Sequence, residues 1–194
     1  MRRLLDSLYR WSGGLAAFFI ASICALVFAQ VILNLIDRIS TLMTGSAIGL
    51  AIPSYADFTG FFLAASSFLA LAYTLREGGH IRVSLFIQHL GPRTRHFVEL
   101  WCLTLALSAS AYFTFYAAHL VYESFTYNDL SAGMIAVPIW IPQAFMLAGL
   151  VILTIALLDE FTTVLRGNNP SYEGKGENLL QGEDPLPNSI IEGK

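Results

Sequence analysis

The sequence predicts an all-α membrane protein with four transmembrane helices, both termini in the cytoplasm and short amphipathic segments at the membrane interface. Hydrophobic residues make up 55% of the 194 residues and charged residues only 13%, compared with roughly 25% charged residues in soluble domains. The mean hydropathy is +0.60. Four apolar runs approach or exceed the roughly 20 residues that a helix needs to span a bilayer. Lysine and arginine are concentrated in alternate connections between these runs.

The first apolar run, residues 13–36, is predicted to be the first transmembrane helix. A basic lead-in with Arg2, Arg3 and Arg10 precedes it. This beginning resembles a secretory signal, because Val27, Phe28 and Ala29 form a site that a signal peptidase could accept. The apolar run continues past that site and is long enough to cross the membrane, which favours a retained helix.

The second apolar run, residues 58–75, is predicted to return through the membrane. Gly60, Ala64 and Ser67 lie on one face at helical spacing, and small residues allow helices to pack closely in a bilayer. The preceding residues, 37–57, mix Thr, Ser and Gly with apolar side chains. We expect this segment to lie along the outer membrane face.

A polar turn at residues 76–84 connects the second and third helices. Two adjacent glycines permit a sharp turn, and Ser84 can cap a short interfacial helix over residues 85–90. Arg76 could pair with Glu99 at the start of the third helix, or both could be solvated. The residues expected to anchor the inner face or to contact another subunit are Arg76, Glu77, Gly78, Gly79, His80, Arg82, Ser84 and Glu99.

The third and fourth helices are predicted over residues 96–122 and 138–158. The loop between them contains no Lys or Arg. Prolines near the start of the fourth helix suit a first turn that needs no backbone donors. These elements complete a membrane domain over residues 1–166. Residues 167–194 are too poor in apolar side chains to bury a core and are predicted to form a disordered cytoplasmic tail.

The distribution of basic residues predicts the orientation. Ten of the 11 Lys and Arg residues fall on one side of the predicted helices, and Arg38 alone falls on the other. By the positive-inside rule, the side with ten is cytoplasmic and carries both termini.

The sequence offers no clear catalytic, metal or cofactor site. Haem ligation needs facing histidines within the membrane, whereas His80, His89 and His96 lie in the polar connection. The two glycine pairs lack the spacing and the lysine of a phosphate-binding loop. No feature indicates binding to nucleic acid. An accessory subunit is therefore the default interpretation, and the alternative is a self-contained, homo-oligomeric four-helix transporter or redox protein.

Two motifs resemble a known family. Residues 76–83 resemble the signature loop of the small, DctQ-like membrane subunit of tripartite ATP-independent periplasmic (TRAP) transporters. The start of the fourth helix also resembles this family, through Pro138, Trp140, Pro142, Gln143 and Gly149. The resemblance covers about residues 1–165. Ser84 departs from the acidic residue that is common in the family, but Ser and Asp are both good helix caps.

The resemblance implies a non-enzymatic scaffold subunit in the bacterial inner membrane. Its implied partners are a large permease subunit, a periplasmic substrate-binding protein and membrane lipid. The large subunit would move a small carboxylate solute with a sodium gradient, so no cofactor is expected on this chain. Residues 37–57 and 123–137 are the candidate docking surface for the binding protein, with Glu123 and Asp129 as candidate contacts.

Overall fold

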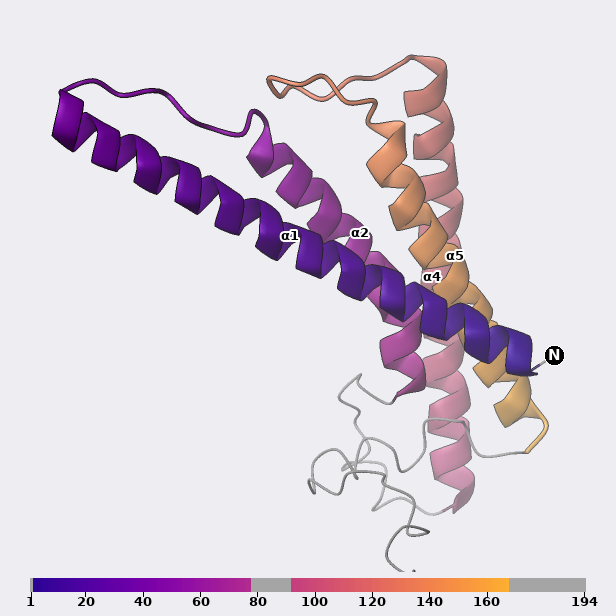
Figure 1. Cartoon of the computed structure of the whole chain (residues 1–194). Helices are drawn as coiled ribbons and strands as arrows, with labels where there is room; N and C mark the ends of the chain where they lie inside the picture. The colour runs from indigo at the N-terminus through magenta and orange to yellow at the C-terminus, as the bar shows by residue number, and fades with distance from the viewer. Residues whose placement is uncertain (1, 78–91, 168–194) are drawn as a thin grey trace, which may run out of the picture.

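The computed structural model describes residues 2–77 and 92–167, and these ranges form four long helices. They are α1 (Arg2–Thr44), α2 (Tyr55–Arg76), α4 (Pro92–Thr126) and α5 (Trp140–Leu165) (Figure 1). All four are long and apolar enough to cross a membrane. This confirms the prediction of an all-helical protein with four potential spans. The expected tail and most of the polar turn lie outside the described residues.

The helices are longer than predicted. Helix α1 spans 43 residues and continues to Thr44, so residues 37–44, which were expected to begin the segment along the outer membrane face, belong to the first helix. It ends where Gly45 adopts a positive φ of 76°, a common helix stop. Helix α4 begins at Pro92 and ends at Thr126, and α5 runs on to Leu165. Apolar content located the spans, whereas local stop residues determine where the helices end.

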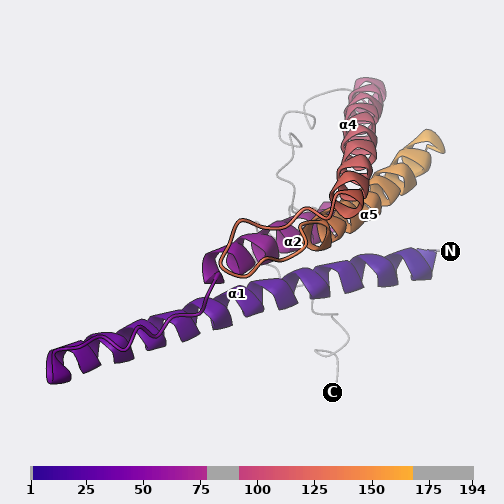
Figure 2. The same ribbon diagram turned by 90° about the horizontal axis from the view of Figure 1, so that it is seen from above.

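The four helices stand in a row in the order α1, α2, α5, α4. Helix α2 packs between α1 and α5, and α5 packs between α2 and α4, while α1 meets α5 only marginally. Helix α1 crosses the others obliquely, so that its C-terminal half diverges from α4 and α5 (Figures 1 and 2). Helices α1 and α4 are therefore the two edges of an open layer.

The core lies along the seams of this row. One seam of α1 consists of residues spaced three or four apart, and they are Leu5, Tyr9, Ser12, Ala16 and Phe19. Such spacing places side chains on one helix face. Phe19 reaches α5, where its ring lies 5.2 Å from the Phe145 ring in an edge-to-face arrangement. A further cluster joins α4 to α5 through Leu103, Leu157 and Val164.

Candidate functional site

Gly149 allows a close contact between the two central helices, α2 and α5. A Cβ atom at this position would lie 2.5 Å from the carbonyl carbon and oxygen of Phe68, and 2.8 Å from the backbone nitrogen of Leu69. On the α1 side, the buried Ser12 hydroxyl donates a hydrogen bond to the Leu69 carbonyl. Helix α2 is thus fixed from both sides at Phe68 and Leu69. The sequence motif singled out Gly149, and the structure shows that its lack of a side chain is needed for packing.

A charged cluster joins the ends of α1 and α2 near the polar turn. The Arg76 guanidinium forms an ion pair with the Asp6 carboxylate. The central carbon (Cζ) of the Arg76 guanidinium also lies 5.2 Å from the centre of the Tyr9 ring. This distance is typical of a cation–π contact. Tyr9 is only 2% exposed and packs with Ala72 and Ala156. Arg76 was expected at a subunit or membrane contact, and the structure places it in a contact within the chain. The pair between Arg76 and Glu99 stays a prediction.

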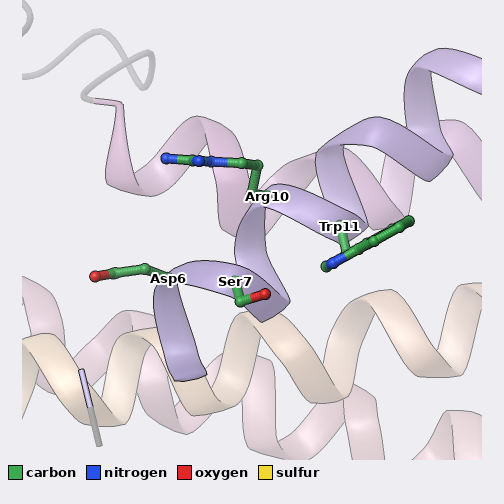
Figure 3. A pocket seen from close by; sticks show the side chains of 4 residues that line it. All are labelled: Asp6, Ser7, Arg10 and Trp11. Atoms are coloured by element: carbon green, nitrogen blue, oxygen red, sulfur yellow. The ribbon is translucent and has the colours of Figure 1, made fainter. Parts of the chain in front are cut away.

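A shallow pocket lies on α1 beside this cluster. It has a volume of about 520 Å³ and is lined by Asp6, Ser7, Arg10 and Trp11. Asp6 and Arg10 extend toward one side of the helix, and Trp11 extends toward the other (Figure 3). Trp11 is 78% exposed. A basic residue next to an exposed tryptophan is typical of the boundary between membrane and water.

At the other end of the helices, away from the Arg76 cluster, residues 45–54 fold back along α1. One Asp37 carboxylate oxygen accepts hydrogen bonds from the backbone nitrogens of Ile48 at 2.7 Å and Gly49 at 2.8 Å. The Gln30 side-chain oxygen accepts another from the nitrogen of Ile52 at 2.8 Å. Two polar side chains of α1 therefore hold this returning segment against the helix.

The connection between α4 and α5 forms a small hairpin at the same end. Leu130 and Pro138 form an antiparallel bridge, and the Ser131 nitrogen donates to the Val137 carbonyl at 2.9 Å. The hairpin reaches over to the start of α2, where the Ile135 nitrogen donates to the Ser54 hydroxyl at 2.9 Å. The two segments that were predicted to form an outer surface are thus in direct contact.

Gly133 brings the hairpin close to α2. A side chain at this position would meet the Asp57 carboxylate and, at 2.6 Å, the Ser54 hydroxyl. Met134, the next residue, is 86% exposed. Asp129 is also exposed, at the base of the hairpin. The hairpin therefore presents both an apolar and an acidic side chain to its surroundings.

An apolar groove of about 600 Å³ lies among α2, α4 and α5. Its lining residues are Phe68, Phe113, Tyr116, Ala117, His119, Leu120, Glu123, Met146 and Leu150. The His119 Nδ1 and Glu123 Oε1 atoms are 3.5 Å apart and form an ion pair when the imidazole is protonated. Glu123, a candidate docking residue in the sequence, thus belongs to this groove, whereas Asp129 belongs to the hairpin.

The other residues of the fourth-helix motif support the start of α5. Pro138 bridges to Leu130 in the hairpin, and the Trp140 ring packs edge-to-face on Phe125 of α4 at 5.6 Å. Pro142 lies in the first turn of α5. The buried Gln143 side-chain oxygen has no hydrogen-bond partner among the described residues. These contacts connect α5 to α4 where the hairpin begins and ends.

A comparison with protein families identifies the chain. The family described as "Tripartite ATP-independent periplasmic transporters, DctQ component" matches residues 23–167, which extend from the middle of α1 to just beyond α5. The chain belongs to the DctQ family. The resemblance seen in the sequence is thereby confirmed, and the protein is a membrane component of a TRAP transporter. No curated protein and no solved structure matches the chain.

Several contacts of this DctQ chain were not predicted from the sequence. Gly78, Gly79, His80, Arg82 and Ser84 lie outside the described residues, so their expected roles stay predictions. Asp6, Tyr9 and Ser12 were not singled out, although they flank or belong to the buried seam of α1. The three-and-four spacing of that seam was the signal that could have identified Tyr9 and Ser12. Gln30 and Asp37 lie seven residues apart, which places them on one face of α1.

Proposed function

We propose that this DctQ chain is a scaffold that braces the large permease subunit of a TRAP transporter in the bacterial inner membrane, with both termini in the cytoplasm. The large subunit then moves a small carboxylate solute with a sodium gradient, and a periplasmic protein delivers the solute. Ten of the 11 basic residues on one side of the spans support the orientation.

The open row of helices is the observation that carries this proposal. Among residues 2–77 and 92–167, α1 and α4 are edges and α2 and α5 contact their neighbours at their sides, so these helices leave the two broad faces of the layer uncovered. Helix α4 has many exposed large apolar residues, and they are Phe97, Trp101, Leu105, Tyr112, Phe113, Phe115, Tyr116, Leu120, Tyr122 and Phe125. A layer of this kind suits a partner that packs along its length.

Small residues on α2 favour a protein partner on one face. Lipid covers apolar side chains as well as a protein does, so close packing between membrane helices depends on small residues at the contact. A Cβ atom at Gly60 would meet nothing within 4 Å among the described residues, and Ser67 is exposed. A helix of the large subunit could approach the α2 backbone closely along this face.

Co-purification tests the scaffold role. The tagged chain is expressed with and without a large TRAP permease subunit, and each preparation is reconstituted for solute uptake with the binding protein. We expect a stable complex and uptake only when the large subunit is present. A monodisperse preparation of this chain alone that catalyses uptake would instead support the self-contained transporter.

A further inference from the structure

The groove among α2, α4 and α5 has the composition of a binding site for an amphipathic molecule. Its volume of about 600 Å³ lies in the range of roughly 300–1,000 Å³ that is usual for small-molecule sites. Ala117 and Leu150 are buried, with 6% and 7% exposure, and they line the groove together with bulkier apolar side chains. The polar side chains, His119 and Glu123, both come from the C-terminal part of α4.

The length of the groove matches one leaflet of a bilayer. Its residues on α4 extend from Phe113 to Glu123, which corresponds to about 15 Å at a rise of 1.5 Å per residue. The hydrocarbon core of a bilayer is roughly 30 Å thick, so one leaflet accounts for about half of that. A single acyl chain that lies in the groove would therefore extend from the interface to the bilayer centre.

Aromatic residues mark the polar end of the groove as the interface. The edge-to-face pair of Phe125 and Trp140 lies where α4 ends and α5 begins, and tryptophan is enriched at the boundary between lipid and water. Glu123 is two residues away from Phe125 along α4. Its side chain is about half exposed, so the carboxylate is accessible to a headgroup at that depth.

The charge at this end favours one class of headgroup. A carboxylate binds a primary ammonium through charge-assisted hydrogen bonds and repels an anionic headgroup. His119 contacts the Glu123 carboxylate from one turn below and so helps to position it. We propose that the groove binds an aminophospholipid, with an acyl chain along Phe113, Tyr116 and Leu120 and the ammonium of phosphatidylethanolamine at Glu123. The described residues that line this site all belong to α2, α4 and α5 of this chain, so lipid binding can be measured on the chain without the large subunit.

Lipid titration of the full chain tests the proposal. The protein is purified in detergent, delipidated, and titrated with phosphatidylethanolamine or phosphatidylglycerol that carry identical acyl chains, and bound lipid is counted by native mass spectrometry. We expect about tenfold tighter binding of phosphatidylethanolamine, which corresponds to a single charge-assisted contact. Glu123→Gln should abolish this preference, whereas Asp129→Asn, which removes an exposed carboxylate outside the groove, should preserve it.

The position of the acyl chain is tested separately. A phosphatidylethanolamine with a photoreactive group in the middle of its acyl chain should label peptides that contain Tyr116 or Met146, in membranes that contain the large subunit as well as in those that lack it. Equal binding of the two lipids, equal effects of the two substitutions, or labelling elsewhere would each refute the proposal. Loss of the label when the large subunit is present would assign the groove to that subunit instead.

Discussion

Single residues fix how closely the helices approach one another, and Gly149 is the clearest case. Because the neighbours of its missing side chain are backbone atoms of α2 at 2.5 Å, they cannot move aside as the end of a flexible side chain could. We expect Gly149→Ala to destabilise the chain by about 1–3 kcal/mol through overpacking, and Gly149→Leu to lower the yield of folded protein further. Thermal unfolding in detergent, followed by circular dichroism, measures the loss of stability, and the amount of monodisperse protein recovered measures the yield.

Gly14 supplies a matched control for this substitution. It is also a helical glycine, but a Cβ atom there would meet nothing within 4 Å among the described residues. Gly14→Ala should therefore be neutral, or stabilise α1 by up to about 1 kcal/mol through helix propensity. If Gly149→Ala and Gly14→Ala gave the same unfolding temperature, the close contact between α2 and α5 would be wrong.

The sequence motifs named individual residues but not the residues that contact them. Gly149 and Arg76 were identified by motifs, and both make close contacts in the structure. Their partners, Phe68 and Asp6, were not identified, because each pair joins helices that are distant in the sequence. Which residues meet depends on the crossing angle of two helices and on how far one is shifted along its axis relative to the other. Local sequence patterns determine neither the angle nor the shift.

At the scale of whole elements, the hairpin over residues 127–139 depends on contact with α2. Gly133 lies against Asp57 and Ser54, and Ile135 is hydrogen-bonded to Ser54. A branched side chain at residue 133 would displace the Asp57 and Ser54 side chains, and movement of the Ser54 hydroxyl would break that bond. We expect Gly133→Val to increase hydrogen exchange of the hairpin amides by about tenfold, which corresponds to the loss of one hydrogen bond of about 1–1.5 kcal/mol.

A neighbouring substitution controls for the bulk of valine. Ala132 is exposed, so Ala132→Val should leave hydrogen exchange of the hairpin nearly unchanged. Amides within α5 should exchange at the same rate in both variants, because the change is local. Protection of the hairpin that is unaltered by Gly133→Val would show that the hairpin does not depend on α2.

Helices were predicted more reliably than their ends or their connections. Long apolar runs identified all four helices that are long and apolar enough to cross a membrane, because a helix in a bilayer must satisfy its backbone internally. The extension of α1 to Thr44 was missed, since residues 37–44 contain the polar side chains Asp37, Arg38 and Thr41. The structure explains the role of one of them, because Asp37 binds the backbone of the returning segment at Ile48 and Gly49. Such a contact has no periodic signature in the sequence.

At the scale of the whole molecule, the row of helices could not be predicted. Four apolar spans are compatible with a compact bundle or with an open layer, because lipid can cover any apolar face. The order α1, α2, α5, α4 follows from tight contacts such as Gly149 against Phe68 and the hydroxyl contact between Ser110 and Thr154 at 2.8 Å. The described helices thus form an open layer with two broad faces, and the hairpin end is a separate surface.

That hairpin end is where we expect the binding protein to dock. The returning segment over residues 45–54 and the hairpin are joined at Ser54, so they form one continuous surface on the face predicted to be periplasmic. Asp129 is exposed on this surface.

Because charges at the rim of an interface mainly alter the rate of association, Asp129→Lys should raise the binding-protein concentration for half-maximal uptake by about fivefold to tenfold. Asp129→Asn should have a smaller effect, and the complex recovered from membranes should be unchanged for both. The difference between variants should shrink as ionic strength rises, because salt screens exposed charges. Uptake at limiting binding protein that is equal in all three proteins would exclude Asp129 from the docking surface.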